Sequence, residues 1–76
     1  MEKKIILKAF GTGLRQQREK AKLSQRDLSF AAECEKSTVQ RLEHGQVDPK
    51  LTTICAMASG LKIELTELVQ FKLIIE

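Results

Sequence analysis

Apolar residues recur at intervals of three or four positions through most of this chain, which is the period of α-helices rather than of strands. The first run repeats every four residues from Ile6 to Leu14 and predicts a helix over about residues 6–22. Gly11 and Gly13 lie inside it, where a glycine costs roughly 1 kcal/mol relative to alanine. The pattern therefore predicts a long first helix that two glycines weaken.

A second helix is predicted from a capping pattern followed by a short apolar stripe. Ser24 stands three residues before Asp27, the spacing at which each side chain can hydrogen-bond the backbone N–H of the other. The stripe that follows consists of Leu28, Ala31 and Ala32. Together these features predict a helix that begins after Ser24 and ends by Ala32.

A third helix is predicted after a turn of only three residues, 33–35, and Gly45 is expected to end it. Successive helical residues are rotated by about 100°, which puts Val39, Leu42 and Glu43 on one face. The opposite face carries the polar side chains Ser37, Gln40, Arg41 and His44. So narrow an apolar stripe indicates a surface helix, and so short a turn makes the two helix axes cross steeply.

The C-terminal half predicts two more helices and an apolar tail. A fourth helix is expected just after Pro49, with a core side made of Leu51, Ile54, Cys55, Ala58 and Leu61. Residues 62–69 predict a fifth, with a core side made of Ile63, Leu65, Leu68 and Val69. The tail at 70–76 suits a strand or a helix and contains Phe71, Leu73, Ile74 and Ile75. The sequence thus predicts an all-α domain of five short helices.

The composition excludes several classes of protein. With 76 residues, the chain has room for a single small domain spanning 1–76. Cys34 and Cys55 are isolated among apolar neighbours, so we expect core residues rather than zinc ligands. One His and no Ser-His or Cys-His pairing argue against an enzyme. Without a signal peptide or membrane-spanning run, a cytoplasmic protein lacking metal and cofactor is expected.

Positive charge is concentrated at one end of the chain. The net charge is +3 and the isoelectric point is near 9.1. Residues 1–26 hold eight Lys or Arg against two Glu, whereas residues 27–76 hold five against eight acidic residues. A basic surface of this kind favours a polyanionic partner, although a solvated charged face is the alternative.

The second and third predicted helices, joined by a three-residue turn, form a helix-turn-helix. The major groove of B-DNA is about 12 Å wide and admits one α-helix. Arg can bind guanine with two hydrogen bonds, Gln can bind adenine in the same way, and Ser suits either base. The outer face of the third helix carries these residue types, so the pattern favours DNA binding.

Over about residues 10–69 the chain resembles the DNA-binding domain of the Cro and lambda-repressor type, also called Xre-like. The matching stretches are FGTGLRQQREKAKLSQRDLS, STVQRLEHG and DPKLTTICAMASGLKIELTELV. The most specific features are Arg18 before LSQ, the RLE.G ending at Gly45, Pro49, and the spacing of Leu61, Ile63, Leu65 and Leu68. The resemblance implies a lambda-repressor-like fold with its helix-turn-helix at the second and third helices.

The resemblance assigns DNA contacts to six residues. The residue that opens the second helix would bind a backbone phosphate. Side chains in the first two turns of the third helix would reach base edges, although Lys36 suits a phosphate equally well. The predicted DNA-binding residues are Gln25, Arg26, Lys36, Ser37, Gln40 and Arg41.

The resemblance also implies a buried ion pair between Arg18 and Glu43, and this fits the helical wheel. The chain departs from the family pattern at the turn position usually held by Gly, where Glu33 would strain a left-handed backbone by roughly 1 kcal/mol. Glu35 replaces the usual Ser or Thr cap. The loop 46–48 lacks the usual Lys or Arg, so backbone contacts there are expected to be weak.

Two functions remain open on these grounds. The first is a sequence-specific transcriptional regulator of double-stranded DNA, expected to act as a repressor and as a homodimer through its apolar terminal extensions. The second is an antitoxin, or another protein-interaction module, which uses the same fold to bind a toxin protein. The poorly basic loop 46–48 and the apolar tail keep the second interpretation open.

Overall fold

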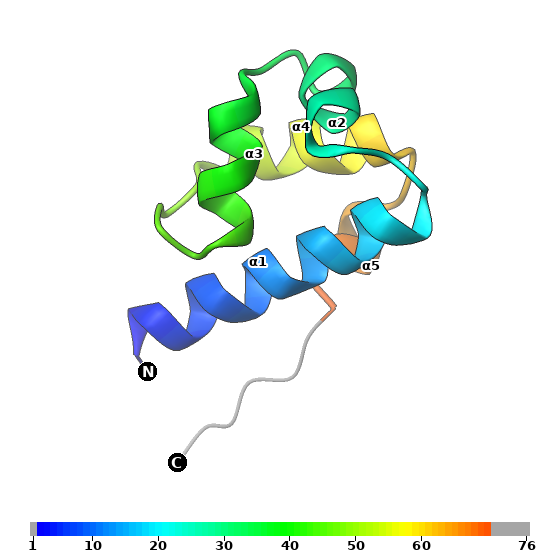
Figure 1. Ribbon diagram of the computed structural model, residues 1–76. Coiled ribbons are helices and arrows are strands. Elements are labelled where there is room, and N and C mark those ends of the chain that lie inside the picture. The colour runs from blue at the N-terminus through cyan, green and yellow to red at the C-terminus, as the bar shows by residue number, and fades with distance from the viewer. Residues whose placement is uncertain (1, 71–76) are drawn as a thin grey trace.

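The computed structural model of the protein describes residues 2–70, and these residues contain five helices. They are α1 (Lys3–Lys20), α2 (Gln25–Ala31), α3 (Lys36–Glu43), α4 (Leu51–Leu61) and α5 (Leu65–Leu68). In Figure 1, α1 runs along the lower side, α2 and α3 lie above it, and α4 lies behind them. The described residues contain no strand, and the all-α fold is confirmed. The apolar tail at 71–76 lies outside the described residues.

The first helix begins before its apolar period does. It spans Lys3–Lys20 rather than 6–22, because its first residues are exposed lysines that contribute nothing to a hydrophobic pattern. Its end is set by Lys22, whose backbone is left-handed with φ of 61°. The N–H of Leu23 then donates to the carbonyl of Arg18 at 3.1 Å, which closes the last turn.

The predicted capping box of α2 is confirmed. The hydroxyl of Ser24 accepts a hydrogen bond from the N–H of Asp27 at 3.0 Å, and the N–H of Ser24 donates to the carboxylate of Asp27 at 2.9 Å. Hydrogen bonding to Ser24, from its backbone first and its side chain second, lowers the pKa of the Asp27 carboxyl, since the charged form is the better acceptor.

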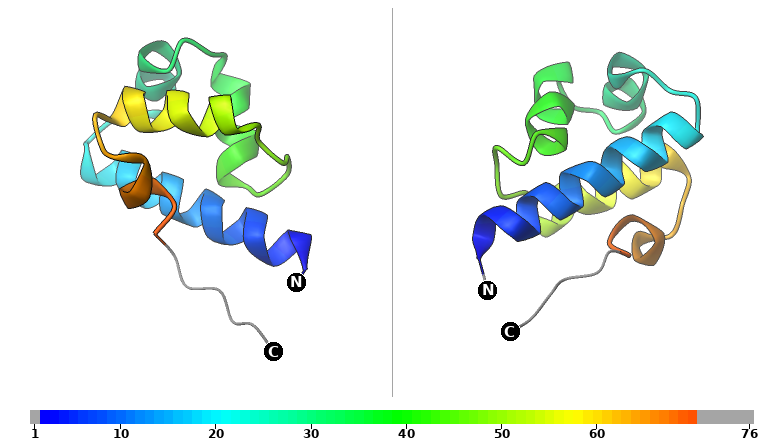
Figure 2. Two further views of the ribbon diagram at one scale, coloured as in Figure 1. Left: turned by 180° about the vertical axis from the view of Figure 1, so that it is seen from behind. Right: turned by 60° about the horizontal axis from the view of Figure 1, so that its bottom comes forward.

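One apolar core joins the helices. Its fully buried side chains come from all five helices, and they are Leu14, Leu28, Val39, Leu42, Met57 and Leu68. The core is completed by four further buried residues, Phe10, Ala32, Ala58 and Leu61. Helices α2 and α3 both pack against their neighbours through this core, and Figure 2 shows from behind how α4 lies across it. The core therefore holds the helix-turn-helix in a fixed orientation on α1 and α4.

The predicted core side of α4 is partly wrong. Leu51 is 67% exposed and Cys55 is exposed, whereas Met57 is fully buried. The buried face therefore differs from the predicted one. The C-terminal turns of α4, which hold its buried residues, pack against α2 and α5, while Leu51 stands in the first turn, at the edge of the core.

Cys34, in the turn between α2 and α3, packs against the core as predicted. Burial raises the pKa of its thiol.

The helix ends also correct the sequence prediction. Of the predicted apolar stripe of α2, Ala31 is exposed, whereas Ala32, the C-cap residue, is buried as predicted. Helix α5 consists of four residues and buries only Leu68 in the core, while Leu65 and Val69 are exposed. A single helical turn can present only one of its sides to a core, so Leu65 and Val69 stay exposed. The predicted core residue Ile63, just before α5, is partly buried against the core.

The turn between α2 and α3 is a Schellman motif with a glutamate in the position that favours glycine. Glu33 has φ of 55°. The N–H of Cys34 donates to the carbonyl of Ser29 at 2.9 Å, and that of Glu33 donates to the carbonyl of Phe30 at 3.2 Å. The backbone is therefore left-handed here, and only glycine adopts this conformation without strain.

Replacing Glu33 with glycine is expected to stabilise the protein by about 0.5–1 kcal/mol, because strain relief exceeds the extra flexibility of the unfolded chain. Glu33→Ala is the matched control, since it removes the same carboxylate but keeps the strain. Urea unfolding of both variants measures the difference. Equal stability of the two variants would show that the backbone at residue 33 is unstrained.

Candidate nucleic-acid interface

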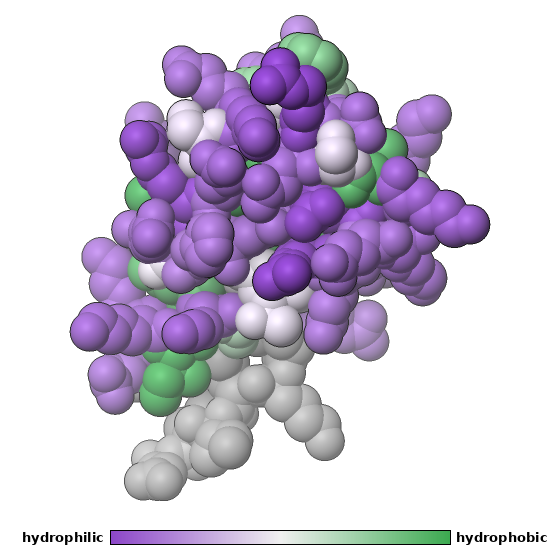
Figure 3. All heavy atoms as spheres, viewed as in Figure 1, coloured by the Kyte–Doolittle hydropathy of each residue, from purple (hydrophilic) through white to green (hydrophobic). Residues whose placement is uncertain are grey.

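Helix α3 has one buried side and one polar outer side. Val39 and Leu42 are fully buried against the other helices, as the helical wheel predicts. On the outer side, Arg41 is exposed, while Ser37 and Gln40 are partly exposed. The face of the molecule seen in Figure 3 is largely hydrophilic. The apolar residues thus anchor α3 and leave a row of hydrogen-bonding side chains on the surface.

Helix α3 meets α1 backbone to backbone at Gly11. A Cβ built on Gly11 would lie 2.5 Å from the carbonyl oxygen of Leu42 and 2.6 Å from that of Glu43. No other residue type fits this contact unless the two helices move apart. From the sequence, Gly11 was interpreted as a weakness of α1; the structure shows that it sets the distance between α1 and α3.

An ion pair also joins α1 to the end of α3. The guanidinium of Arg18 donates through Nε to one carboxylate oxygen of Glu43 and through Nη2 to the other at 3.0 Å. Its Nη1 donates to the carbonyl of Leu23 at 2.9 Å. The hydrogen bond to Glu43 is the main reason that the pKa of Arg18 is raised, and burial opposes it.

Gln25 is attached to the same carboxylate. Its amide nitrogen donates to Oε1 of Glu43 at 3.1 Å, so the first residue of α2 is tied to the last residue of α3. A glutamine amide carries two N–H donors, which leaves one for a further acceptor. The structure thus brings Arg18, Gln25 and Glu43 into one hydrogen-bonded group that orients both helices of the helix-turn-helix.

The remaining predicted residues lie around this group at the surface. Arg26 and Lys36 are exposed, in the first turns of α2 and α3. Glu35 caps α3 through its extended backbone, and its side chain makes no capping hydrogen bond. The exposed His44 is the C-cap residue of α3 and places Nδ1 2.8 Å from the carbonyl oxygen of Gln40.

The loop after α3 reaches a part of α1 that the sequence analysis did not single out. A Cβ on Gly45, whose φ is 67°, would lie 3.2 Å from Cα of Lys8. Asp48 in the same loop pairs with Lys3 at 3.7 Å. These residues are some forty positions apart, and no local pattern signals the contact.

Metal-binding groups and membrane-spanning helices are both absent from the described residues. Within residues 2–70, no group of three or more His, Cys, Asp or Glu side chains is arranged to hold a metal ion. None of the five helices is both long enough and apolar enough to cross a membrane.

Comparisons with known proteins agree with this geometry. A family model described as a helix-turn-helix domain matches residues 9–71. The restriction-modification controller protein C.AhdI from Aeromonas hydrophila is 39% identical over 82% of this chain and 94% of its own, with a TM-score of 0.80. No curated protein sequence matches the chain.

Two more distant structures share the fold. An HTH_3 family transcriptional regulator from Vibrio cholerae is 19% identical, covers 88% of this chain and 38% of its own, and has a TM-score of 0.84. The clp gene regulator ClgR from C. glutamicum is also 19% identical, covers 83% of this chain and 82% of its own, and has a TM-score of 0.79.

Proposed function

The chain belongs to the helix-turn-helix domain family, and from this premise we propose that it regulates transcription by reading a specific DNA sequence with α3. The observation that carries the proposal is the two-sided character of α3, which is buried through Val39 and Leu42 and polar outside. An α-helix with its side chains is about 10–12 Å in diameter, which matches the width of the major groove, about 12 Å. The outer side chains of α3 are then next to the base edges.

The proposed contacts divide into two kinds. Arg41, exposed in the second turn of α3, is assigned to guanine, and Gln40 beside it is assigned to adenine. Ser37 adapts to either base. Gln25, Arg26 and Lys36 stand at the starts of helices, where cations, amides and backbone N–H groups suit phosphate oxygens.

Arg41→Ala is expected to weaken binding to the preferred duplex by roughly 1–3 kcal/mol and binding to random duplexes much less. The preferred duplex is first obtained by selecting random duplexes against the purified protein. Arg41→Lys is the matched variant, because lysine keeps the charge but loses the two-pronged hydrogen bonding of arginine. If Arg41→Lys binds both kinds of duplex as the native protein does, Arg41 contacts a phosphate and the assignment to a base is wrong.

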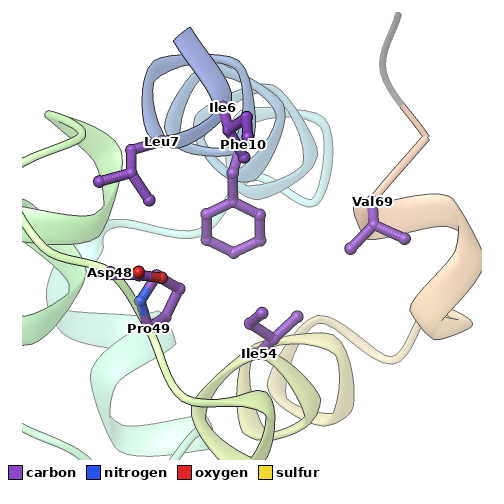
Figure 4. Close-up of a pocket in the computed structure, with 7 residues that line it drawn as sticks. All are labelled: Ile6, Leu7, Phe10, Asp48, Pro49, Ile54 and Val69. Carbon is purple, nitrogen blue, oxygen red and sulfur yellow. The ribbon is translucent and has the colours of Figure 1, made fainter. Parts of the chain in front are cut away.

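We further propose that the protein acts as a homodimer. An apolar groove of about 130 Å³ lies between α1 and the start of α4 and is bordered by Val69 (Figure 4). Its lining includes Ile6, Leu7, Phe10, Pro49 and Ile54. Ile5 is 52% exposed, Val69 is 40% exposed, and the sequence after Val69 adds Phe71, Leu73, Ile74 and Ile75. Apolar surface of this kind supports self-association.

A dimer also suits the length of α3, since two copies related by a two-fold axis would read half-sites about 34 Å apart, one turn of DNA. Deleting residues 71–76, or making Val69→Glu, is expected to give a folded monomer that binds the preferred duplex much more weakly. Phe30→Glu is the control, because Phe30 is 70% exposed but does not line the groove. Sedimentation at micromolar concentration measures this, and a full-length chain that is monomeric both off and on DNA contradicts the proposal.

A further inference from the structure

The loop after α3 lies directly on the backbone of α1 at Lys8. A Cβ on Gly45 would be 3.2 Å from both N and Cα of Lys8, and 3.3 Å from the carbonyl carbon of Leu7. Figure 1 shows the end of α3 and the start of this loop just above α1, from where the chain turns up to α4. Gly45 comes one residue after the C-cap of α3. Lys8 is therefore held beside the C-terminal end of the helix that we assign to the major groove.

Three of the six cations of α1 form ion pairs within the described residues. Arg18 binds Glu43, Arg15 lies 3.4 Å from Glu19, and Lys3 lies 3.7 Å from Asp48. Lys4 and Lys8 form no ion pair with any residue of the described part of the chain. Both side chains are exposed, so their charges are available to a partner outside the chain.

Lys4 and Lys8 share one side of α1, next to α3. They are four residues apart, and side chains at this spacing are neighbours on a helix surface. Lys8 is three residues before Gly11, the residue in contact with the α3 backbone, and this spacing also keeps two residues on one side. Lys4 and Lys8 thus lie on the side of α1 that meets the C-terminal end of α3.

With α3 in the major groove, the sugar-phosphate backbones run along both edges of that groove. The starts of α2 and α3 carry Gln25, Arg26 and Lys36 at one end of the interface. At the other end, residues 45–49 contain no Lys or Arg, and the carboxylate of Asp48 would repel a phosphate. The exposed Lys50 follows this loop as the N-cap of α4. Helix α1 adds further positive charge where Gly45 contacts Lys8, and its lysine stems are long enough to span a helix radius of about 5–6 Å.

We propose that Lys4 and Lys8 bind the DNA phosphate backbone beside the C-terminal end of α3, a contact that rests on the proposed function. Lys3 assists by neutralising Asp48. The contact is electrostatic and carries no sequence preference. It fixes the position of α3 along the groove from the side opposite to α2.

The test compares two double variants that remove equal charge. Lys4→Gln with Lys8→Gln removes the proposed contact. Lys20→Gln with Lys62→Gln is the control, because both lysines are exposed and Lys20 is nine residues from Gly11, on the opposite side of α1. Affinity for the preferred duplex and for a random duplex is measured against salt concentration, after thermal melting shows that each variant is folded.

The first variant is expected to lose about tenfold in affinity for both duplexes at low salt. The slope of log affinity against log salt should become shallower by about 1–2 per protomer, since each phosphate contact contributes about 0.9. An unchanged slope, or an equal change in the control variant, overturns the proposed lysine contact. The proposed function still stands in that case, provided that the native protein binds the preferred duplex. A native protein that binds neither duplex overturns both.

Discussion

Replacing Arg18 with alanine is expected to destabilise the folded protein by about 3–5 kcal/mol, because the partner carboxylate is left buried without its counter-charge. The Arg18 side chain is 12% exposed and that of Glu43 is 3% exposed. Only the hydrogen bond from Gln25 would still satisfy Glu43. Urea unfolding of the variant gives the free energy of unfolding directly.

The ion pair itself need not be the source of that stability. The double variant Arg18→Met, Glu43→Leu is expected to cost far less than Arg18→Ala, since two apolar side chains need no partner. A double-mutant cycle with Glu43→Leu separates the pairwise interaction from the cost of a lone charge. Single and double variants that unfold at the same urea concentration would show that solvent screens the pair.

Gly11→Ala is expected to destabilise the protein by about 2–3 kcal/mol, the upper part of the usual range for overpacking. The added methyl group would meet the carbonyl oxygens of Leu42 and Glu43. Those atoms belong to the backbone of α3, so relief requires that the whole helix shift away from α1. The same shift should weaken DNA binding, because it moves α3 relative to α2.

Gly13→Ala provides the matched control within the same helix. A Cβ on Gly13 would lie 3.6 Å from the carbonyl oxygen of Leu68, an ordinary contact. This variant is expected to stabilise the protein by about 0.5–1 kcal/mol, because alanine favours a helix over glycine. Thermal melting of the two variants should therefore shift in opposite directions. A higher melting temperature for both variants would mean that helix propensity outweighs packing at Gly11.

Comparison of these two glycines shows where prediction from the sequence stops. Both stand in the same predicted helix and received the same energetic estimate. Only the position of α3 distinguishes them, since it lies against Gly11 and not against Gly13. Leu51 and Cys55 illustrate the same limit, because their spacing matches the core side of α4 while neighbouring helices cover a different side.

The sequence alone determined the number and type of helices, the capping box at Ser24 and the polar outer side of α3. Each depends on residues within about four positions of one another, and such spacings are set by helix geometry. The tertiary structure decided the contact of Gly45 with Lys8 and the attachment of Gln25 to Glu43. These features depend on how close separate helices approach, and that distance follows from the packing of the whole core.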